Sequence, residues 1–151
     1  MDLSMVIDES RINLELDVAD KAEAIDALAD MLMASGALSS KEGFVQDVYL
    51  REAEGMTGIG GGIAIPHGKS NSVIKTSLAI GRTKAPILWE SLDDEPIQCI
   101  ILFAVRDVDS TTVHVKLLGE FAGKLADEQV VERLFSSTQT SEIIAIFSGN
   151  K

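Results

Sequence analysis

Apolar positions in the first third of the chain repeat with helical spacing in two places. Asp20-Lys21-Ala22-Glu23 forms a capping-box pattern, and apolar residues then recur at intervals of three and four over residues 25–33. Ser39-Ser40-Lys41-Glu42 repeats the start signal ahead of an apolar stripe over residues 44–49. The two predicted helices end near Gly36 and Gly55, because glycine suits the left-handed turn that follows a helix.

The next apolar runs have the length and composition of strands, over residues 63–65, 77–80 and 97–105. The last run is almost continuously apolar, which predicts a central strand covered on both faces. A polar, loop-like stretch follows at residues 107–112. Helical spacing then returns over residues 113–125, 128–135 and 141–147. Helices before, between and after strands predict a single α/β domain over residues 1–151.

Composition narrows the possible partners and location. The chain of 151 residues carries a formal net charge of −11, which argues against nucleic acid and against anionic membrane surfaces. Its N-terminus, Met1-Asp2-Leu3-Ser4, is acidic and lacks a secretory pattern, and no apolar run reaches the roughly 18 residues of a membrane span. We therefore expect a soluble cytoplasmic protein without direct membrane insertion.

Other common sites are not indicated. Gly68-Lys69-Ser70 lacks the earlier glycine of a P-loop, because Ile63 stands at that position. Two histidines and one remote cysteine have no metal-ligand spacing, so neither a metal nor another cofactor is expected. Cys99 lies within an apolar run and is expected to be a buried small hydrophobe. Asp93-Asp94-Glu95 is most simply a solvated turn.

The most specific pattern is a glycine-rich segment that leads through a short apolar run to a histidine, Thr57-Gly58-Ile59-Gly60-Gly61-Gly62-Ile63-Ala64-Ile65-Pro66-His67-Gly68. Glycine permits positive φ and close approach, whereas proline fixes its own φ and favours an extended residue before it. The pattern predicts an imidazole at the end of a strand with little side-chain bulk around it. A structural histidine is the simpler alternative.

This segment resembles the phosphoryl-accepting signature of enzyme IIA domains of the bacterial sugar phosphotransferase system, fructose/mannitol type. The match runs from Glu52 to Gly68, and family-like stretches occupy residues 50–52, 78–82, 86–89 and 114–119. The resemblance implies a mixed β-sheet flanked by helices. It also implies that His67 takes a phosphoryl group from phospho-HPr and passes it to a cysteine of enzyme IIB. The enzyme IIB could in turn work with a membrane enzyme IIC. Two positions depart from the family, Gly61 and Val113, where polar residues are common.

The chemistry expected of His67 follows from neutral imidazole. With a reference pKa of about 6.5, the ring is largely unprotonated at neutral pH. One nitrogen can then attack phosphorus while the other keeps its proton. A hydrogen bond from that N–H group to a backbone carbonyl would fix the tautomer.

Two residues are candidate helpers for His67, of which the resemblance implies His114. His114, near the start of the predicted 113–125 helix, would balance the phosphoryl group, although its position alone equally suits an ordinary first-turn histidine. Arg51, in the last turn of the second helix, could donate two hydrogen bonds to phosphate oxygens. Its alternatives are a solvated helix-end cation, favoured by the macrodipole, and a site in which the nearby Lys69 takes this role.

Three further residues are candidates for stabilising phosphate. The Thr57 hydroxyl could bind the anion or belong to a turn, and both readings stay open. Backbone N–H groups of the glycine turn, including those of Gly58 and Gly60, could contribute as well. The glycines, Gly68 among them, are also expected to leave a shallow, open surface for protein partners, with Ile59 and Ile63 at its apolar edge.

Two functions are consistent with the sequence. The first is a phosphocarrier of sugar uptake, an enzyme-class phosphotransferase. The second is a regulatory module of the nitrogen type, in which the phosphorylated histidine controls binding to other proteins. A phosphohistidine adds roughly two negative charges to a neutral ring, which would change a binding surface in either case.

Overall fold

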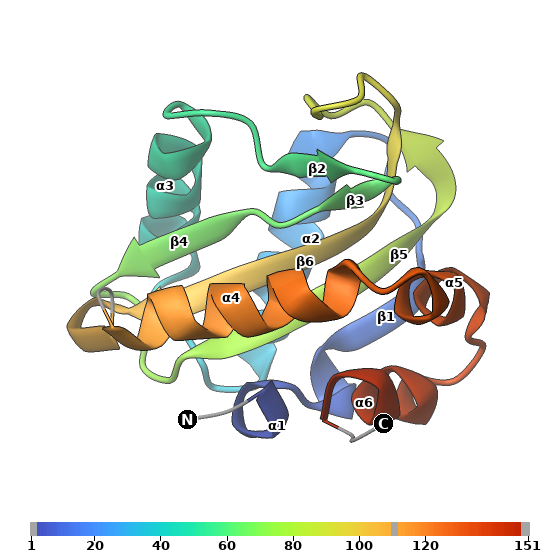
Figure 1. Ribbon diagram of the computed structural model, residues 1–151. Helices are drawn as coiled ribbons and strands as arrows, with labels where there is room; N and C mark the ends of the chain where they lie inside the picture. Colours follow the sequence, from blue (N-terminus) through green and yellow to red (C-terminus); the bar gives the residue numbers. More distant parts are fainter. Residues whose placement is uncertain (1–2, 110–111, 149–151) are drawn as a thin grey trace.

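A mixed sheet separates two groups of helices in the computed structural model, which describes residues 3–109 and 112–148 (Figure 1). The described strands are β1 (Ile12–Leu16), β2 (Gly58–Gly60), β3 (Ile63–Ala64), β4 (His67–Ser70), β5 (Ser77–Ile87) and β6 (Ile97–Arg106). Their order is β1-β5-β6-β3-β2, and β4 also pairs with β6. The β5–β6 and β2–β3 pairs are antiparallel, whereas the β1–β5, β3–β6 and β4–β6 pairs are parallel. The predicted single α/β domain with a mixed, helix-flanked sheet is confirmed.

The helices cover the two faces of the sheet unequally. Helices α2 (Lys21–Ala34) and α3 (Lys41–Glu52) pack on one face. The other face is covered by α1 (Leu3–Val6), α4 (Thr112–Leu125), α5 (Glu128–Ser136) and α6 (Thr140–Ser148). Two short 3₁₀ turns, η1 (Glu9–Arg11) and η2 (Asp107–Asp109), complete the described elements. None of the described helices has the length and apolar character needed to cross a membrane.

Strand β6 is the centre of the fold, as its apolar run predicts. Its side chains alternate between the two cores: Ile100, Leu102 and Ala104 face α2 and α3, and Ile101, Phe103 and Val105 face α4–α6. Each of these residues is at most 1% exposed. Cys99 lies in the same strand and is fully buried, and burial raises the pKa of its thiol to about 12. It therefore serves as a small hydrophobe.

The predicted ends of α2 and α3 are also confirmed. The Asp20 carboxylate accepts a hydrogen bond from the Glu23 backbone N–H, and the Ser40 hydroxyl accepts one from that of Gly43. After α2 the chain turns at Gly36, whose φ is +85°. Arg51 lies in the last turn of α3, as expected, so the helix delivers it to the glycine-rich segment.

Other elements differ from the expectation. His67 opens strand β4 instead of closing the run before it, because β6 offers Phe103–Arg106 as a parallel partner to His67–Ser70. The sequence of β4 has no apolar or β-branched residue, so only the neighbouring strand makes it extended. Strand β5 continues to Ile87, and η2 occupies the start of the stretch that was expected to be a loop. Strands β1 and β2 were not predicted, although Ile12, Leu14 and Leu16 alternate in β1.

Gly68 allows α3 to approach β4 closely. A Cβ atom added to Gly68 would lie 2.9 Å from Val48 Cγ2, 3.0 Å from Phe44 Cε1 and 3.3 Å from the Val48 backbone nitrogen. Phe44 and Val48 are both fully buried on the inner face of α3. The missing side chain at Gly68 thus faces the core, which corrects the expectation that it opens a surface for partners.

We expect Gly68→Ala to lower the free energy of unfolding by about 1–3 kcal/mol, because the added methyl overpacks a buried contact. The matched control is Gly123→Ala in α4, where a Cβ would meet nothing within 4 Å. That change should be neutral or stabilising by about 0.5–1 kcal/mol. Urea denaturation compares the two, and equal effects would contradict this account of Gly68.

Candidate functional site

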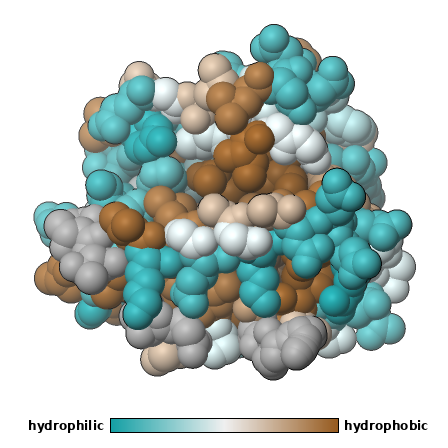
Figure 2. All heavy atoms as spheres, in the orientation of Figure 1, coloured by the Kyte–Doolittle hydropathy of each residue, from teal (hydrophilic) through white to brown (hydrophobic). Residues whose placement is uncertain are grey.

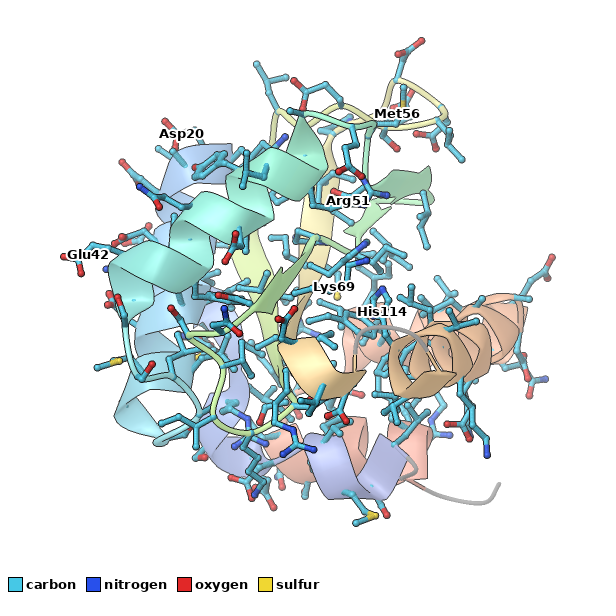
Figure 3. All side chains as sticks on the ribbon, turned by 90° about the vertical axis from the view of Figure 1, so that its left-hand side faces the viewer. Asp20, Glu42, Arg51, Met56, Lys69 and His114 are labelled. Carbon is cyan, nitrogen blue, oxygen red and sulfur yellow. The ribbon has the colours of Figure 1, made fainter. Side chains whose placement is uncertain are left out.

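The candidate site lies where three elements meet at one side of the sheet. His67 begins β4, Arg51 comes from the last turn of α3, and His114 from the first turn of α4. In the view of Figure 3 Arg51, Lys69 and His114 gather in the same region, between the ends of α3 and α4. The imidazole rings of His67 and His114 are 5.1 Å apart between centroids. The structure therefore brings together both histidines and the arginine that the sequence analysis singled out.

Two neighbours fix the tautomer of His67. Its Nδ1 is 3.1 Å from the backbone carbonyl oxygen of Ile65, and its Nε2 is 3.0 Å from Arg51 Nε. A guanidinium N–H only donates and a carbonyl only accepts, so Nδ1 carries the proton and Nε2 carries the lone pair. The neutral ring is thus oriented with one nucleophilic nitrogen, and that nitrogen faces Arg51.

The surroundings of His67 favour this neutral form. The side chain is buried, with 6% of its surface exposed, and burial is the main cause that lowers its pKa. The positive charges of Arg51 and Lys69 lower it further, whereas the Ile65 hydrogen bond and the Glu52 carboxylate act in the opposite direction. The net shift is downward, so Nε2 is unprotonated at neutral pH.

His114 is a buried histidine with an unsatisfied nitrogen. It is 5% exposed, and its Nδ1 has no hydrogen-bond partner within residues 3–109 and 112–148. Burial, followed by the interaction with His67 and the positive charges of Lys69 and Arg51, lowers its pKa to about 4. Leaving a buried polar atom unpaired costs about 1–3 kcal/mol, so a hydrogen-bond partner for this nitrogen would stabilise the site.

Arg51 is held by its own helix end as well as by His67. Its Nη1 donates to the carbonyl oxygen of Gly55 at 3.1 Å, in the segment that follows α3. The guanidinium is therefore oriented by the backbone while its Nε–H points at the nucleophilic nitrogen. Arg51 is thus a cation held in a fixed orientation by two hydrogen bonds, and the alternative of a solvated helix-end residue does not apply.

The Thr57 hydroxyl is already engaged. It donates to Glu52 Oε2 at 2.6 Å and accepts from Trp89 Nε1 at 3.3 Å. Glu52 in turn forms an ion pair with Lys21 at 2.6 Å, so the start of α2, the end of α3 and the glycine segment are tied together. Glu52 opens the signature stretch, but no local pattern predicts this bracing role.

The glycine turn is likewise braced from outside. Gly60, Gly61 and Gly62 all have positive φ, as their sequence predicts. The N–H groups of the two candidate glycines, Gly58 and Gly60, donate to the carbonyl oxygen of Glu90 and the hydroxyl of Ser91. The N–H groups of both candidates are thus already engaged in hydrogen bonds within the chain.

The acidic segment Asp93-Asp94-Glu95 was expected to be only a solvated turn, but it has a structural role beside the glycine turn. Asp93 Oδ2 accepts from the Gly61 N–H at 3.0 Å, and Asp93 Oδ1 accepts from the Glu95 N–H at 3.1 Å. These bonds lower the pKa of the Asp93 carboxyl. Among the described residues, no group of three or more His, Cys, Asp or Glu side chains is arranged to hold a metal ion.

Part of the surface near the site is apolar. Figure 2 shows apolar atoms gathered where β2 and β3 lie above α4. Ile59 and Ile65 of this region are half-buried, whereas Ile63 is only 2% exposed. Ile59 therefore remains available as an apolar edge, and the expectation for Ile63 is wrong because β3 directs its side chain into the core.

The family model described as "Phosphoenolpyruvate-dependent sugar phosphotransferase system, EIIA 2" matches residues 5–150. The PTS system 2-O-α-mannosyl-D-glycerate-specific EIIABC component of Escherichia coli K12 is 33% identical over 146 residues, 96% of this chain. The chain spans only 22% of that relative's length.

Two solved structures are similar over nearly their whole length. The nitrogen regulatory protein IIA-Ntr of Neisseria meningitidis superimposes with a TM-score of 0.87 at 28% identity, covering 95% of this chain and 97% of that one. Enzyme IIA-Mtl of Escherichia coli, solved in complex with phosphorylated enzyme IIB-Mtl, has a TM-score of 0.80 at 25% identity, covering 96% and 100%.

The burial of neutral His114 makes stability depend on pH. Its pKa is about 4 in the folded protein and about 6.5 in an unfolded chain, so the unfolded state binds the additional proton as pH falls through this window. Its contribution is complete above about pH 6.5 and decreases toward pH 4, by up to about 1.4 kcal/mol per pH unit. In His114→Gln this loss is absent, so the variant should gain stability relative to wild type between pH 6.5 and 5. Urea denaturation at several pH values measures the difference, and a constant difference would contradict the prediction.

Proposed function

The chain belongs to the EIIA 2 family of the phosphoenolpyruvate-dependent sugar phosphotransferase system, and from this premise we propose that it is a cytoplasmic phosphocarrier whose His67 accepts a phosphoryl group from phospho-HPr. The observation that supports this most directly is the orientation of the His67 ring. Its Nδ1 faces the Ile65 carbonyl, and its Nε2 lone pair faces Arg51. The ring is neutral, nucleophilic at one defined atom, and requires no proton transfer before it reacts.

In the proposed step the Nε2 lone pair of His67 forms a bond to phosphorus. The bond between phosphorus and the donor nitrogen of HPr breaks, and its electron pair stays on that donor nitrogen. The proton on Nδ1 remains in place, held by the Ile65 carbonyl. Such a transfer mainly requires positioning and stabilisation of charge on the phosphoryl oxygens.

Arg51 and His114 are proposed to supply part of that stabilisation. The new bond forms at the atom to which Arg51 Nε now donates, so the guanidinium moves from this nitrogen to a phosphoryl oxygen. His114 brings a neutral ring with an unpaired buried nitrogen to the same place. Thr57, Gly58 and Gly60, whose groups are already hydrogen-bonded, are assigned to holding the site in shape.

The onward step is proposed to be transfer to a cysteine of an enzyme IIB. A thiolate attacks phosphorus, and the electron pair of the breaking bond returns to His67 Nε2. The likeness to IIA-Mtl, solved with phosphorylated IIB-Mtl, supports IIB as the kind of partner. The name of the E. coli relative joins EIIA with parts B and C, and a membrane enzyme IIC would then complete sugar uptake. The half-buried Ile59 and the apolar surface in Figure 2 support a shallow docking face.

A regulatory role is the second candidate, and the likeness to IIA-Ntr of Neisseria meningitidis favours it. The phosphohistidine would then act as a switch, because about two negative charges appear on a neutral, largely buried ring. Transfer assays distinguish the two roles. Rapid loss of phosphate to a IIB cysteine supports transport, whereas a protein that binds only one phosphorylation state supports regulation.

His67 is expected to be the only acceptor. Wild-type protein incubated with phospho-HPr should take up one phosphoryl group in an acid-labile, base-stable linkage at Nε2, measured by mass spectrometry and ³¹P NMR. His67→Gln should take up none, while the control His114→Gln should still be phosphorylated. Stoichiometric uptake by His67→Gln would refute the assignment.

Replacing either helper should slow transfer without abolishing it. Losing one donor to a developing anion typically costs about 10²–10³ in rate, so Arg51→Ala and His114→Ala should each fall in this range. Rapid-quench measurement of the transfer rate from phospho-HPr tests this, with circular dichroism as a check on folding. Wild-type rates in both variants would remove them from the proposed site.

A further inference from the structure

Lys69 projects from the same face of β4 as His67. Side chains two residues apart in a strand point to the same side of the sheet. Their partners on β6 agree, because His67 pairs with Phe103 and Lys69 with Val105, and both partners lie in the core beneath α4. Lys69 therefore lies on the side of the sheet that carries the imidazole. In the view of Figure 3 it lies in the same region as Arg51 and His114.

Lys69 is also an unpaired cation in an acidic protein. The chain has 24 acidic residues against 13 basic ones, and Lys21 and Lys41 each form ion pairs with two carboxylates. Lys69 is exposed and makes no hydrogen bond or ion pair with the part of the chain that the structure describes. Its charge nevertheless lowers the pKa of both His67 and His114, which places it within electrostatic reach of both rings.

The phosphorylated site needs a second positive charge. A phosphoryl group on His67 brings roughly two negative charges at neutral pH. Arg51 supplies one positive charge, and His114 is neutral in the unphosphorylated protein, where its pKa is about 4. The groups of Thr57, Gly58 and Gly60 are already hydrogen-bonded within the chain. Lys69 adds a second cation on this face, and within residues 3–109 and 112–148 it forms no ion pair with a carboxylate.

We propose that Lys69 is a catalytic ligand of the phosphoryl group, whose ammonium binds a non-bridging oxygen during transfer to His67 and in the phosphorylated state. This inference rests on the proposed function. Arg51 is held at Nε2 and at the Gly55 carbonyl before transfer, whereas the Lys69 ammonium is free on a flexible stem. Lys69 meets the incoming phosphoryl group first, and Arg51 joins once its bond to Nε2 is displaced.

The first test is kinetic. Phosphoryl transfer from phospho-HPr is followed by rapid quench in wild type, Lys69→Met, Lys69→Arg and Lys84→Met. Lys84 is an exposed lysine of β5 that lies beyond Arg82, at the end of the sheet away from β4. Its replacement by methionine changes the net charge by the same amount as Lys69→Met and therefore serves as the control. We expect kcat/KM to fall about 10- to 100-fold in Lys69→Met, to recover largely in Lys69→Arg, and to stay within about twofold in Lys84→Met. The rate should also depend less on salt in Lys69→Met.

The second test reads the phosphoryl group itself. A ³¹P NMR titration of phosphorylated protein should show a higher pKa for the second ionisation of the phosphoryl group in Lys69→Met, because a cation that stabilises the dianion is gone. The charged or titratable groups around His67 are Arg51 and Glu52 of α3, Lys69 of β4 and His114 of α4. Only Lys69 differs between the two samples.

The outcomes separate this inference from the proposed function. If wild type accepts no phosphoryl group, the proposed function fails and the role of Lys69 fails with it. If wild type is phosphorylated but Lys69→Met matches it in rate and in phosphoryl pKa, the role of Lys69 alone is wrong. A slower rate with an unchanged phosphoryl pKa would mean that Lys69 acts on the partner protein, which also overturns the proposal.

Discussion

The site depends on one arrangement, an imidazole held between a carbonyl oxygen and a guanidinium. The Ile65 carbonyl can only accept and Arg51 can only donate, so together they leave His67 a single neutral tautomer with its lone pair on Nε2. Burial supports the same state by disfavouring a charged ring. Because these two neighbours set the tautomer, the ring needs neither reorientation nor deprotonation for the proposed role as a nucleophile.

Much of the surrounding fold keeps these two neighbours in place. Strand β6 pairs with both β3 and β4, so the segment containing Ile65 and His67 is fixed along a buried strand. Helix α3 packs directly on Gly68 and thereby fixes the distance at which Arg51 can reach the ring. The Lys21–Glu52 ion pair and the Glu52–Thr57 hydrogen bond tie the end of that helix to the glycine segment. Glycine in this segment serves packing and turn geometry as much as access.

Electrostatics give the site a character opposite to that of the whole protein. The chain carries a net charge of −11, yet the groups around His67 include Arg51 and Lys69 and a second histidine that stays neutral. Two neutral rings beside two cations are poorly matched to an empty site and well matched to a dianionic phosphoryl group. The same match would hold whether the proposed phosphoryl group is passed on or acts as a signal, and the chain is similar both to a sugar-specific relative and to a nitrogen regulatory protein.

The sequence by itself determined the fold class, the central strand, the capped ends of α2 and α3, and the identity of the candidate nucleophile, because these depend on local periodicity, caps and glycine conformation. It did not determine β4, whose residues are extended only because β6 lies beside them. It also left open which nitrogen of His67 carries the lone pair. It did not decide whether Thr57 and the turn glycines bind a ligand or form hydrogen bonds within the chain. Those questions are decided by contacts between residues far apart in the chain, such as Gly61 with Asp93 and Arg51 with His67, which no local pattern encodes.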